Sequence, residues 1–499
     1  MALLKFEDSS HAASKAADWP DLGTVDSRGA RLFDARPAYR RLTVVADAEL
    51  VDAVDSDPWS PKYLLNGLLT HNFVTLYRYA DDGPPGNVPW HVFPNGAKHP
   101  LGWVLADVQA AHQVRNIIYT NSPHSFTYTG ITGNRVEAAE RDVSSTAYRS
   151  LPSDEARRRR EADAIAVLAA ECVQADLFIT ERPYLFENSV SKQHGVTVCS
   201  LADALALVGL YLRAQSQYVL IQSPSGTFPL VGSKLGYFWV GARELLPEVW
   251  RWGAAFGQIK NDELQGLALS AIERIRRALI KRDELNISLQ SYHGNNAVSE
   301  VITALDELLV GCMGAIDVTA RVAHDVLGVS GRSSNAGWQR SGWLRDVARA
   351  NQSVADLVQP GGHQAHVLKI LTAMRNTVHA EVLQGAMHQS GDGSQEPLVR
   401  LPPGEAQDIV TAMDATGGRA HWGVKQEIQY ASYVDPQRFV EAALPAVIAL
   451  LNLIMKTVPV DKMPGVHLAP QDCLPPAGDS WQNSFAEQKR QSIRWQLGL

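Results

Sequence analysis

Residues 153–186 have the sequence SDEARRRREADAIAVLAAECVQADLFITERPYLF, and this stretch decides the fold of the first half of the chain. It begins with Ser153, an expected N-cap, followed by acidic residues in the first turn, and both features favour a helix start. An Ala-rich amphipathic segment then leads into the short apolar run DLFIT. A second apolar run, GVTVCS, and the helical pattern LADALALVGLYLRAQ come next. Helix, strand, strand and helix joined by short connections predict an α/β unit with a mostly parallel sheet.

The composition is that of a globular protein without a strong charge bias. Of the 499 residues, 45% are hydrophobic and 20% are charged, and the formal net charge is −7. A chain of this length is long enough for several domains, each with a buried core. The charge gives no basic field over the whole surface, so binding of nucleic acid would need a local patch or pocket.

Cysteine usage and apolar runs predict a cytoplasmic protein that does not span a membrane. The four cysteines are far apart and none lies in a zinc-ligand spacing, which fits a reducing compartment. The N-terminus lacks the basic start and the long apolar run of a signal peptide. The longest apolar run, ALPAVIALLNLIM, is shorter than the roughly 20 residues of a membrane span and predicts a buried helix.

Shifts of pattern along the chain predict five regions. We expect a polar arm at residues 1–40, an α/β domain at 41–215, a linker with a Trp-rich connecting helix at 216–262, a helical bundle at 263–458 and a C-terminal tail at 459–499. In the first domain, RLTVVADAELVDAV predicts a strand followed by a helix, and VLADVQAAHQVRNIIYT predicts a helix followed by a strand. The stretch QSPSGTFPLVGSK marks the expected boundary before the helical half.

The second half shows helical patterns almost throughout, which predicts an all-α bundle. Apolar residues recur at i, i+3, i+4 and i+7 over residues 298–327, and Gly328 is placed to end that helix. Further helices are predicted over roughly 363–388 and from Asp435, an expected N-cap, to about residue 456. In the basic stretch ERIRRALIKR, the charged residues form an outer face that is either solvated or lines an RNA groove.

The stretch AMRNTVHAE, residues 373–381, places Arg375 and His379 one helical turn apart. Both lie on the flank of an apolar stripe made of Val367, Leu371, Met374, Val378 and Val382. At such an edge a guanidinium is suited to hold an RNA phosphate, and an imidazole to act on the 2′-hydroxyl or the leaving oxygen. The same spacing also fits an ordinary helix in which Arg375 pairs with Asp317 or Glu381.

The segment LTAMRNTVHAEVL resembles the signature helix of HEPN (higher eukaryotes and prokaryotes nucleotide-binding) domains, where an arginine, a polar residue and a histidine form a ribonuclease site. The resemblance covers about residues 265–458. It implies that Arg375 and His379 are catalytic, that Asn376 supports them, and that this site needs no metal or other cofactor. It also implies an RNA substrate, a homodimer, and a toxin or phage-defence role under a regulatory partner. The motif departs from the family in having only three residues between arginine and histidine, fewer than usual.

Acidic residues of the first half resemble those of PIN-like nucleases. ADAIAVLAAECVQADLFITERPYL is similar to a segment in which one acid opens an Ala-rich helix and another follows a strand ending in Thr. The resemblance implies that Asp163, Glu181 and the weaker match Asp47 hold Mg²⁺ or Mn²⁺, which activates water against a phosphodiester. Glu181 stands one place early and is Glu where the family has Asp. Without such a site, Asp163 is a helix-start charge and Glu181 is a turn residue.

Three functions remain open from the sequence. The first is a metal-independent RNA endonuclease acting through Arg375 and His379, and the second is a metal-dependent nuclease acting through Asp163 and Glu181. The third is a non-catalytic RNA-binding, sensor or scaffold protein in which both sites are degenerate. The sequence contains no P-loop, dinucleotide-binding, nucleophile-elbow or HExxH motif, so ATPase, dehydrogenase and common hydrolase functions lose support.

Overall fold

The structure is a computed structural model that describes residues 41–52, 57, 60–80, 90–92, 98–100, 102–111, 114–122, 125–143, 146–186, 194–221, 230–290, 295–380, 383–389, 395–428, 431–478 and 483–498. The chain divides into two compact units. The first unit contains Met1–Gly232 and Arg494–Gly498, and the second contains Ser233–Ile493. The predicted arm at residues 1–40 lies outside the described residues.

A seven-stranded sheet forms the centre of the first unit, with strand order β7-β6-β5-β2-β1-β8-β9. The strands from β5 to β9 in this order run parallel, and β6 and β7 extend the sheet as an antiparallel hairpin. The parallel sheet predicted for the first half is therefore confirmed. The strands are β1 Leu42–Asp47, β2 Val74–Ala80, β5 Gly102–Ala111, β6 Val114–Ser122, β7 Ser125–Thr132, β8 Leu177–Ile179 and β9 Thr197–Cys199, and shorter hairpins pair β3 Trp90–Val92 with β4 Lys98–Pro100 and β10 Tyr218–Ile221 with β11 Leu230–Gly232.

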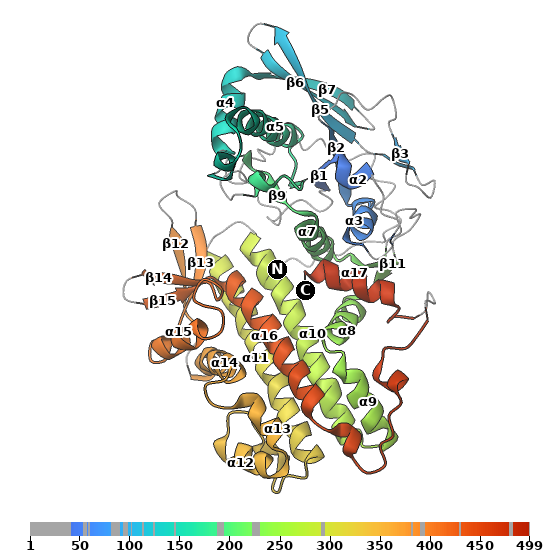
Figure 1. The fold of residues 1–499 in the computed structure, drawn as a ribbon, viewed down its shortest axis with the longest axis vertical. Coiled ribbons are helices and arrows are strands. Elements are labelled where there is room, and N and C mark those ends of the chain that lie inside the picture. Colours follow the sequence, from blue (N-terminus) through green and yellow to red (C-terminus); the bar gives the residue numbers. More distant parts are fainter. Residues whose placement is uncertain are drawn as a thin grey trace. The chain divides into compact units, whose positions relative to one another are not determined.

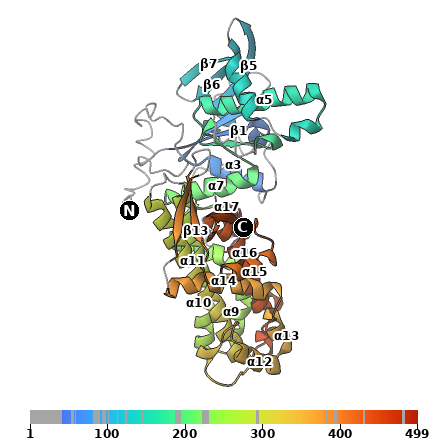
Figure 2. The same cartoon turned by 90° about the vertical axis from the view of Figure 1, so that its left-hand side faces the viewer.

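Helices cover both faces of this sheet. They are α2 Ala48–Asp52, α3 Pro61–Leu69, α4 Gly133–Asp142, α5 Ser153–Cys172 and α7 Leu201–Ala214. Figures 1 and 2 show α5 and α7 on opposite sides of β1. Val44 and Val45 point to opposite faces of β1 and both are fully buried. The continuous apolar run LTVVA thus forms a strand that is covered on both sides, as is usual in a parallel sheet.

Two predictions for the first unit are wrong in detail. The stretch VLADVQAA, predicted as a helix, lies in strand β5, which pairs with β2 on one edge and β6 on the other. Its alanines favour a helix, but pairing along both edges determines the conformation. Ser153 is the first helical residue of α5 instead of its N-cap, and the N-cap Pro152 makes no side-chain hydrogen bond.

Long helices form most of the second unit. Helices α10 and α11 pack side by side along their length, and α8, α9, α14 and α16 pack around them (Figure 1). The predicted stripe of α11 is largely buried, and Gly328, with φ of 60°, follows the end of the helix as expected. The helices are α8 Lys234–Leu245, α9 Glu248–Gln258, α10 Asp262–Gln290, α11 Asn295–Val326, α12 Ser341–Ala350, α13 Gln352–Ala355, α14 His363–Ala380, α15 Ala406–Asp414, α16 Pro436–Thr457 and α17 Glu487–Leu497.

The second unit is mostly helical, as predicted, but it is not all-α. A four-stranded antiparallel sheet has the order β12-β13-β15-β14, with β12 Gly385–Gln389, β13 Gln395–Arg400, β14 Val424–Ile428 and β15 Ala431–Val434. The helix predicted over 363–388 therefore ends earlier, at Ala380. At Gly385 a Cβ would lie 2.6 Å from Ile302 Cδ1 and 2.8 Å from Val298 Cγ1. The strand can approach α11 this closely because residue 385 has no side chain.

The regions predicted as a linker at 216–262 and a tail at 459–499 contribute to folded units. Strands β10 and β11 belong to the first unit, and α8 and α9 pack against α10 in the second. Arg251 of α9 donates to carbonyl oxygens at the C-terminus of α16, those of Met455, Lys456 and Val458. It also forms ion pairs with Glu248 and with Asp461, which lies in the predicted tail.

Helix α16 was predicted as a buried helix, and the structure agrees. Asp435 is its N-cap and accepts hydrogen bonds from the backbone N–H groups of Gln437 and Arg438. The segment Pro436–Lys462 is, among the described residues, long and apolar enough to cross a membrane by length and composition. Half of its most apolar stretch is buried inside the protein, so its length and composition are weak evidence for a membrane span.

Replacing Arg251 with Met should lower the free energy of unfolding of the second unit by about 2 kcal/mol. The variant keeps the apolar part of the side chain and removes the guanidinium. The three carbonyl oxygens at the end of α16 then lose their hydrogen bonds to that guanidinium. Urea unfolding measures the change. Arg349→Met is the control, because Arg349 forms an exposed ion pair with Asp346 and its loss should change little. Equal effects of the two variants would contradict a stabilising role of the Arg251 cap.

A buried histidine makes the stability of the first unit depend on pH. His71, between α3 and β2, is 4% exposed, and its Nδ1 accepts a hydrogen bond from the backbone N–H of Phe73 at 3.2 Å. Burial disfavours the charged imidazole and lowers the pKa of His71 to about 4. The histidine pKa of the unfolded chain is about 6.5. Between about pH 4 and 6.5 the unfolded chain therefore binds a proton at His71 and the folded chain does not.

Stability of the first unit should therefore be complete above about pH 6.5 and fall as the pH drops toward 4, by up to about 3 kcal/mol from His71. Denaturant unfolding at a series of pH values measures this slope. His71→Asn keeps an acceptor for the Phe73 N–H but does not titrate, so its profile should be flatter. His363→Asn, at an exposed histidine, is the matched control. A His71→Asn profile as steep as that of the wild type would contradict the assignment.

Candidate functional site

Arg182 joins two of the three acids that the sequence proposes as metal ligands. Asp47 ends strand β1, and Asp163 lies on α5. The Arg182 guanidinium donates from Nε to Asp47 Oδ2 at 3.3 Å and from Nη1 to Asp163 Oδ1 at 3.3 Å. Thr180, which follows β8, also donates its hydroxyl to Asp47. The structure thus brings Asp47 and Asp163 to one place, with a cation of the chain itself between them.

Asp163 is held by a second donor on its other oxygen. The Tyr148 hydroxyl donates to Asp163 Oδ2 at 2.7 Å, and both residues are buried. Burial raises the pKa of Asp163, while the Tyr148 hydrogen bond and the charge of Arg182 oppose that rise. Burial, followed by the hydrogen bond to Asp163, raises the pKa of Tyr148. Tyr148 therefore acts as a hydrogen-bond donor that stays protonated.

The acid–arginine cluster of Asp47, Asp163 and Arg182 lies where ligands commonly bind in open α/β sheets. The chain continues from β1 to β2 on one side, whereas β8 pairs with the other edge of β1, so the strand order reverses there. The carboxyl ends of the strands on either side of such a switch point leave a crevice for a ligand. Asp47 is at the carboxyl end of β1, and Thr180 follows the carboxyl end of β8.

Glu181, the third proposed metal ligand, is used elsewhere. Its Oε1 accepts a hydrogen bond from the backbone N–H of Leu201 at 3.1 Å, at the N-terminus of α7. Among the described residues no group of three or more His, Cys, Asp or Glu side chains is arranged to hold a metal ion. Because Arg182 supplies positive charge between Asp47 and Asp163, the present side-chain arrangement does not fit a divalent metal ion. No step of the proposed chemistry is assigned to such an ion.

Replacing Arg182 with Met should lower the free energy of unfolding of the first unit by about 3 kcal/mol, because it leaves two largely buried carboxylates without their shared cation. Denaturant unfolding measures the loss, with Arg135→Met as the control, since Arg135 forms a more exposed ion pair with Glu171. Added Mn²⁺ should raise the Tm of Arg182→Met and leave that of the wild type unchanged. A rise for the wild type would restore the metal-site hypothesis.

The second candidate site is on α14, which carries Arg375, Asn376 and His379. Val367, Leu371 and Met374 of the predicted stripe are fully buried, so the expected core face of α14 is present. Arg375 is half-buried on the flank of this face, and its buried Nε has no hydrogen-bond partner in the described part of the chain. The backbone of α14 continues to Ala380. The side chains of Asn376 and His379, and residue Glu381, lie outside the described residues.

Asp317 of α11 is surrounded by arginines. The guanidiniums of Arg375, Arg321, Arg274 and Arg340 all act on its carboxylate. Burial raises the pKa of Asp317, and these four positive charges oppose the rise. Within the described residues Asp317 forms no direct ion pair, so the suggestion that Arg375 pairs with it holds only as a through-space interaction.

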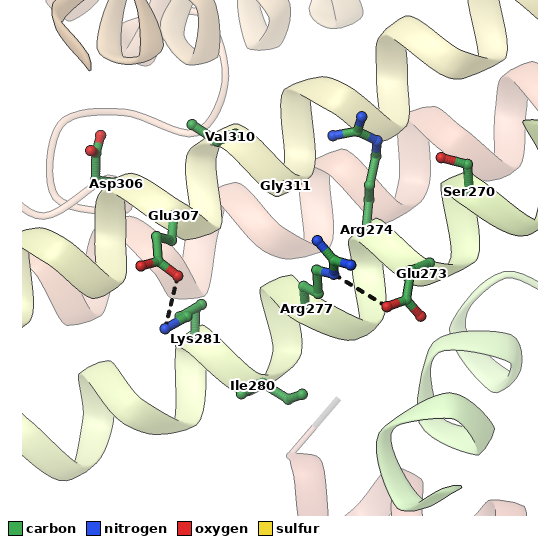
Figure 3. Close-up of a pocket in the computed structure, with 10 residues that line it drawn as sticks. All are labelled: Ser270, Glu273, Arg274, Arg277, Ile280, Lys281, Asp306, Glu307, Val310 and Gly311. Atoms are coloured by element: carbon green, nitrogen blue, oxygen red, sulfur yellow. Dashed lines mark hydrogen bonds and ion pairs between the residues drawn. The ribbon is translucent and has the colours of Figure 1, made fainter. Parts of the chain in front are cut away.

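A groove lies between α10 and α11, with a cavity volume of about 470 Å³ (Figure 3). Arg274, Arg277 and Lys281, all from the basic stretch ERIRRALIKR, line it. These three residues of the stretch therefore line a groove, and the expectation that it is an RNA groove stays a prediction. Acidic residues from both helices line the groove as well, namely Glu273, Asp306 and Glu307.

The sequence did not single out Arg182 or Tyr148, which hold the acids of the first site. Arg182 directly follows the proposed ligand Glu181, and a basic residue after a strand end next to a buried acid could have suggested an internal ion pair. Nothing local indicates Tyr148, because its partner Asp163 lies on the next helix. Asp317 was considered as a partner of Arg375, but the accumulation of arginines around it depends on tertiary packing alone.

No protein-family model matches the chain, and no curated protein or solved structure matches it significantly.

Proposed function

We propose that this protein is an RNA endonuclease that cleaves through Arg375 and His379 and needs no metal ion at that site. The observation that carries the proposal is the half-buried Arg375, whose buried Nε has no hydrogen-bond partner in the described part of the chain and whose charge, with those of Arg321, Arg274 and Arg340, acts on the Asp317 carboxylate. RNA offers a polyanionic backbone, and guanidinium groups bind phosphate with paired hydrogen bonds.

The chemistry follows from RNA's own 2′-hydroxyl. In the proposed step the imidazole of His379 takes the 2′-hydroxyl proton, and the 2′-oxygen attacks the adjacent phosphorus. The bond from phosphorus to the 5′-oxygen breaks, and that oxygen takes a proton from water as it leaves, while the proton on His379 returns to solvent. Arg375 stabilises the negative charge that grows on the phosphoryl oxygens, and its half-buried position strengthens the interaction because less water screens it. The products are a 2′,3′-cyclic phosphate and a 5′-hydroxyl.

The resemblance of LTAMRNTVHAEVL to the HEPN signature helix supports the same assignment, with Asn376 as a supporting polar residue and a homodimer as the working form. The acids of the first unit support a metal-dependent nuclease less well, since Arg182 binds both Asp47 and Asp163. The first unit is then a binding or regulatory module. A non-catalytic RNA-binding protein would use the same arginines to bind RNA. It differs from the proposed nuclease in that the RNA is not cleaved.

The purified protein should cleave cellular RNA in the presence of EDTA and leave 2′,3′-cyclic phosphate ends. Arg375→Ala should reduce the cleavage rate by roughly 10²–10³-fold through loss of charge stabilisation, and His379→Ala by roughly 10²–10⁴-fold through loss of proton transfer. Asp163→Asn should cleave at the wild-type rate. End-group analysis and single-turnover kinetics measure these outcomes.

Lys369→Ala is the matched control for this experiment. Lys369 is another cation of α14, and it forms an exposed ion pair with Asp408. Its loss should leave the cleavage rate unchanged. A slower rate in Arg375→Ala alone would then show that the cation is needed at residue 375, and not only somewhere on α14. Cleavage that requires Mn²⁺ and fails in Asp163→Asn would contradict the proposal, and RNA binding without cleavage would favour the non-catalytic alternative.

A further inference from the structure

Arg274 occupies space that exists only because residue 314 is glycine. A Cβ built at Gly314 of α11 would lie 2.1 Å from Arg274 Nη1 and 2.6 Å from Cζ. Figure 3 shows the Arg274 side chain extending from α10 toward α11. A glycine inside a helix costs about 1 kcal/mol relative to alanine. Because residue 314 has no side chain, the Arg274 guanidinium lies directly against the backbone of α11.

Arg274 is not paired with any of the acidic residues that line the groove. Arg277 forms an ion pair with Glu273 at 3.2 Å, and Lys281 with Glu307 at 2.8 Å. In contrast, Arg274 makes no hydrogen bond or ion pair with any residue in the described ranges, and its Nε is buried without an acceptor. A half-buried guanidinium without a partner is unfavourable unless an anion binds to it.

Arg274 also borders the site of Arg375. Gly314 and Asp317 are one helical turn apart on α11, and Arg274 and Arg375 both act on the Asp317 carboxylate. Helix α14, which carries Arg375, packs against α11, as α10 does, so the groove and Arg375 both border α11. A strand of RNA repeats its phosphates at intervals of one nucleotide, so neighbouring cation sites can hold successive phosphates.

We propose that Arg274 binds a second phosphate of the RNA, next to the one held by Arg375. This inference rests on the proposed function, and it names single-stranded RNA as the substrate class. Gly314 is then a positioning residue, since it determines where the Arg274 guanidinium lies. Arg277 and Lys281 are already paired with Glu273 and Glu307 and make no specific phosphate contact.

Gly314→Ala tests the proposal without removing any charge, because the added methyl group displaces only the end of a flexible side chain. The matched control is Gly266→Ala in α10, where a Cβ meets nothing within 4 Å. Both are made in the His379→Ala background, so that RNA stays intact. The Kd for a single-stranded RNA oligonucleotide is measured by fluorescence anisotropy over a range of salt concentrations.

Gly314→Ala should weaken binding about tenfold and reduce the slope of log K against log salt by about 0.7, as expected for one lost phosphate contact with a single strand. Gly266→Ala should bind as the background does. Arg274→Gln, which removes the charge and keeps Gly314, should show the same loss of slope. The double variant Gly314→Ala/Arg274→Gln should be no weaker than Arg274→Gln alone, since both changes remove one contact.

The outcomes separate this inference from the proposed function. Tight, salt-dependent binding of RNA with an unchanged slope in both Gly314→Ala and Arg274→Gln would overturn the role of Arg274 and leave the nuclease proposal standing. A loss with Gly314→Ala that Arg274→Gln does not reproduce would also overturn it, since the shape of the helix and not the cation would then be responsible. If the wild type neither binds nor cleaves RNA, the proposed function itself fails.

Discussion

The second unit depends on the close approach of α10 and α11, the two longest helices. At Gly311 a Cβ would lie 3.2 Å from the carbonyl oxygen of Arg274, so the two backbones nearly touch at this level. The helices can pack this tightly because α11 has small residues on the side that faces α10. The same glycine-containing segment lets the Arg274 side chain pass along α11, since Gly314 is one turn away from Gly311. Packing of the bundle and placement of a cation therefore have one common cause.

The two units handle charge in opposite ways. In the first, Arg182 neutralises Asp47 and Asp163, and Tyr148 and Thr180 supply further hydrogen bonds to the two carboxylates. That arrangement fixes the carboxyl ends of β1 and β8 relative to α5. In the second unit, the charges of four arginines act on the carboxylate of Asp317, which forms no direct ion pair in the described part of the chain. The first arrangement is a set of direct ion pairs and hydrogen bonds, whereas the second acts through space.

The parts of the fold that were predictable are those with strong local patterns. The run LTVVA gave β1, the apolar stripe over 298–327 gave α11, and the Asp435-Pro436 pair gave the start of α16. The four strands of the small sheet were not predicted, because each contains no more than six residues. The need for glycine at residue 385 comes from its contact with Ile302, which lies far away in the sequence. The candidate sites were predictable only in part for a related reason. Arg182 and Asp47 are separated by 135 positions, so no spacing in the sequence reveals their contact.

The first unit is discontinuous in sequence, which affects its biosynthesis. The buried Arg213 of α7 donates to the carbonyl oxygen of Gln496, and the side-chain amide of Gln496 donates to the carbonyl oxygen of Val219. These partners are separated by 283 and 277 positions. On the ribosome, α7 and β10 emerge long before Gln496 is synthesised, so the first unit can collapse early but completes its packing only after the whole helical unit has been made. A chain stalled within the helical unit therefore carries an unfinished α/β unit.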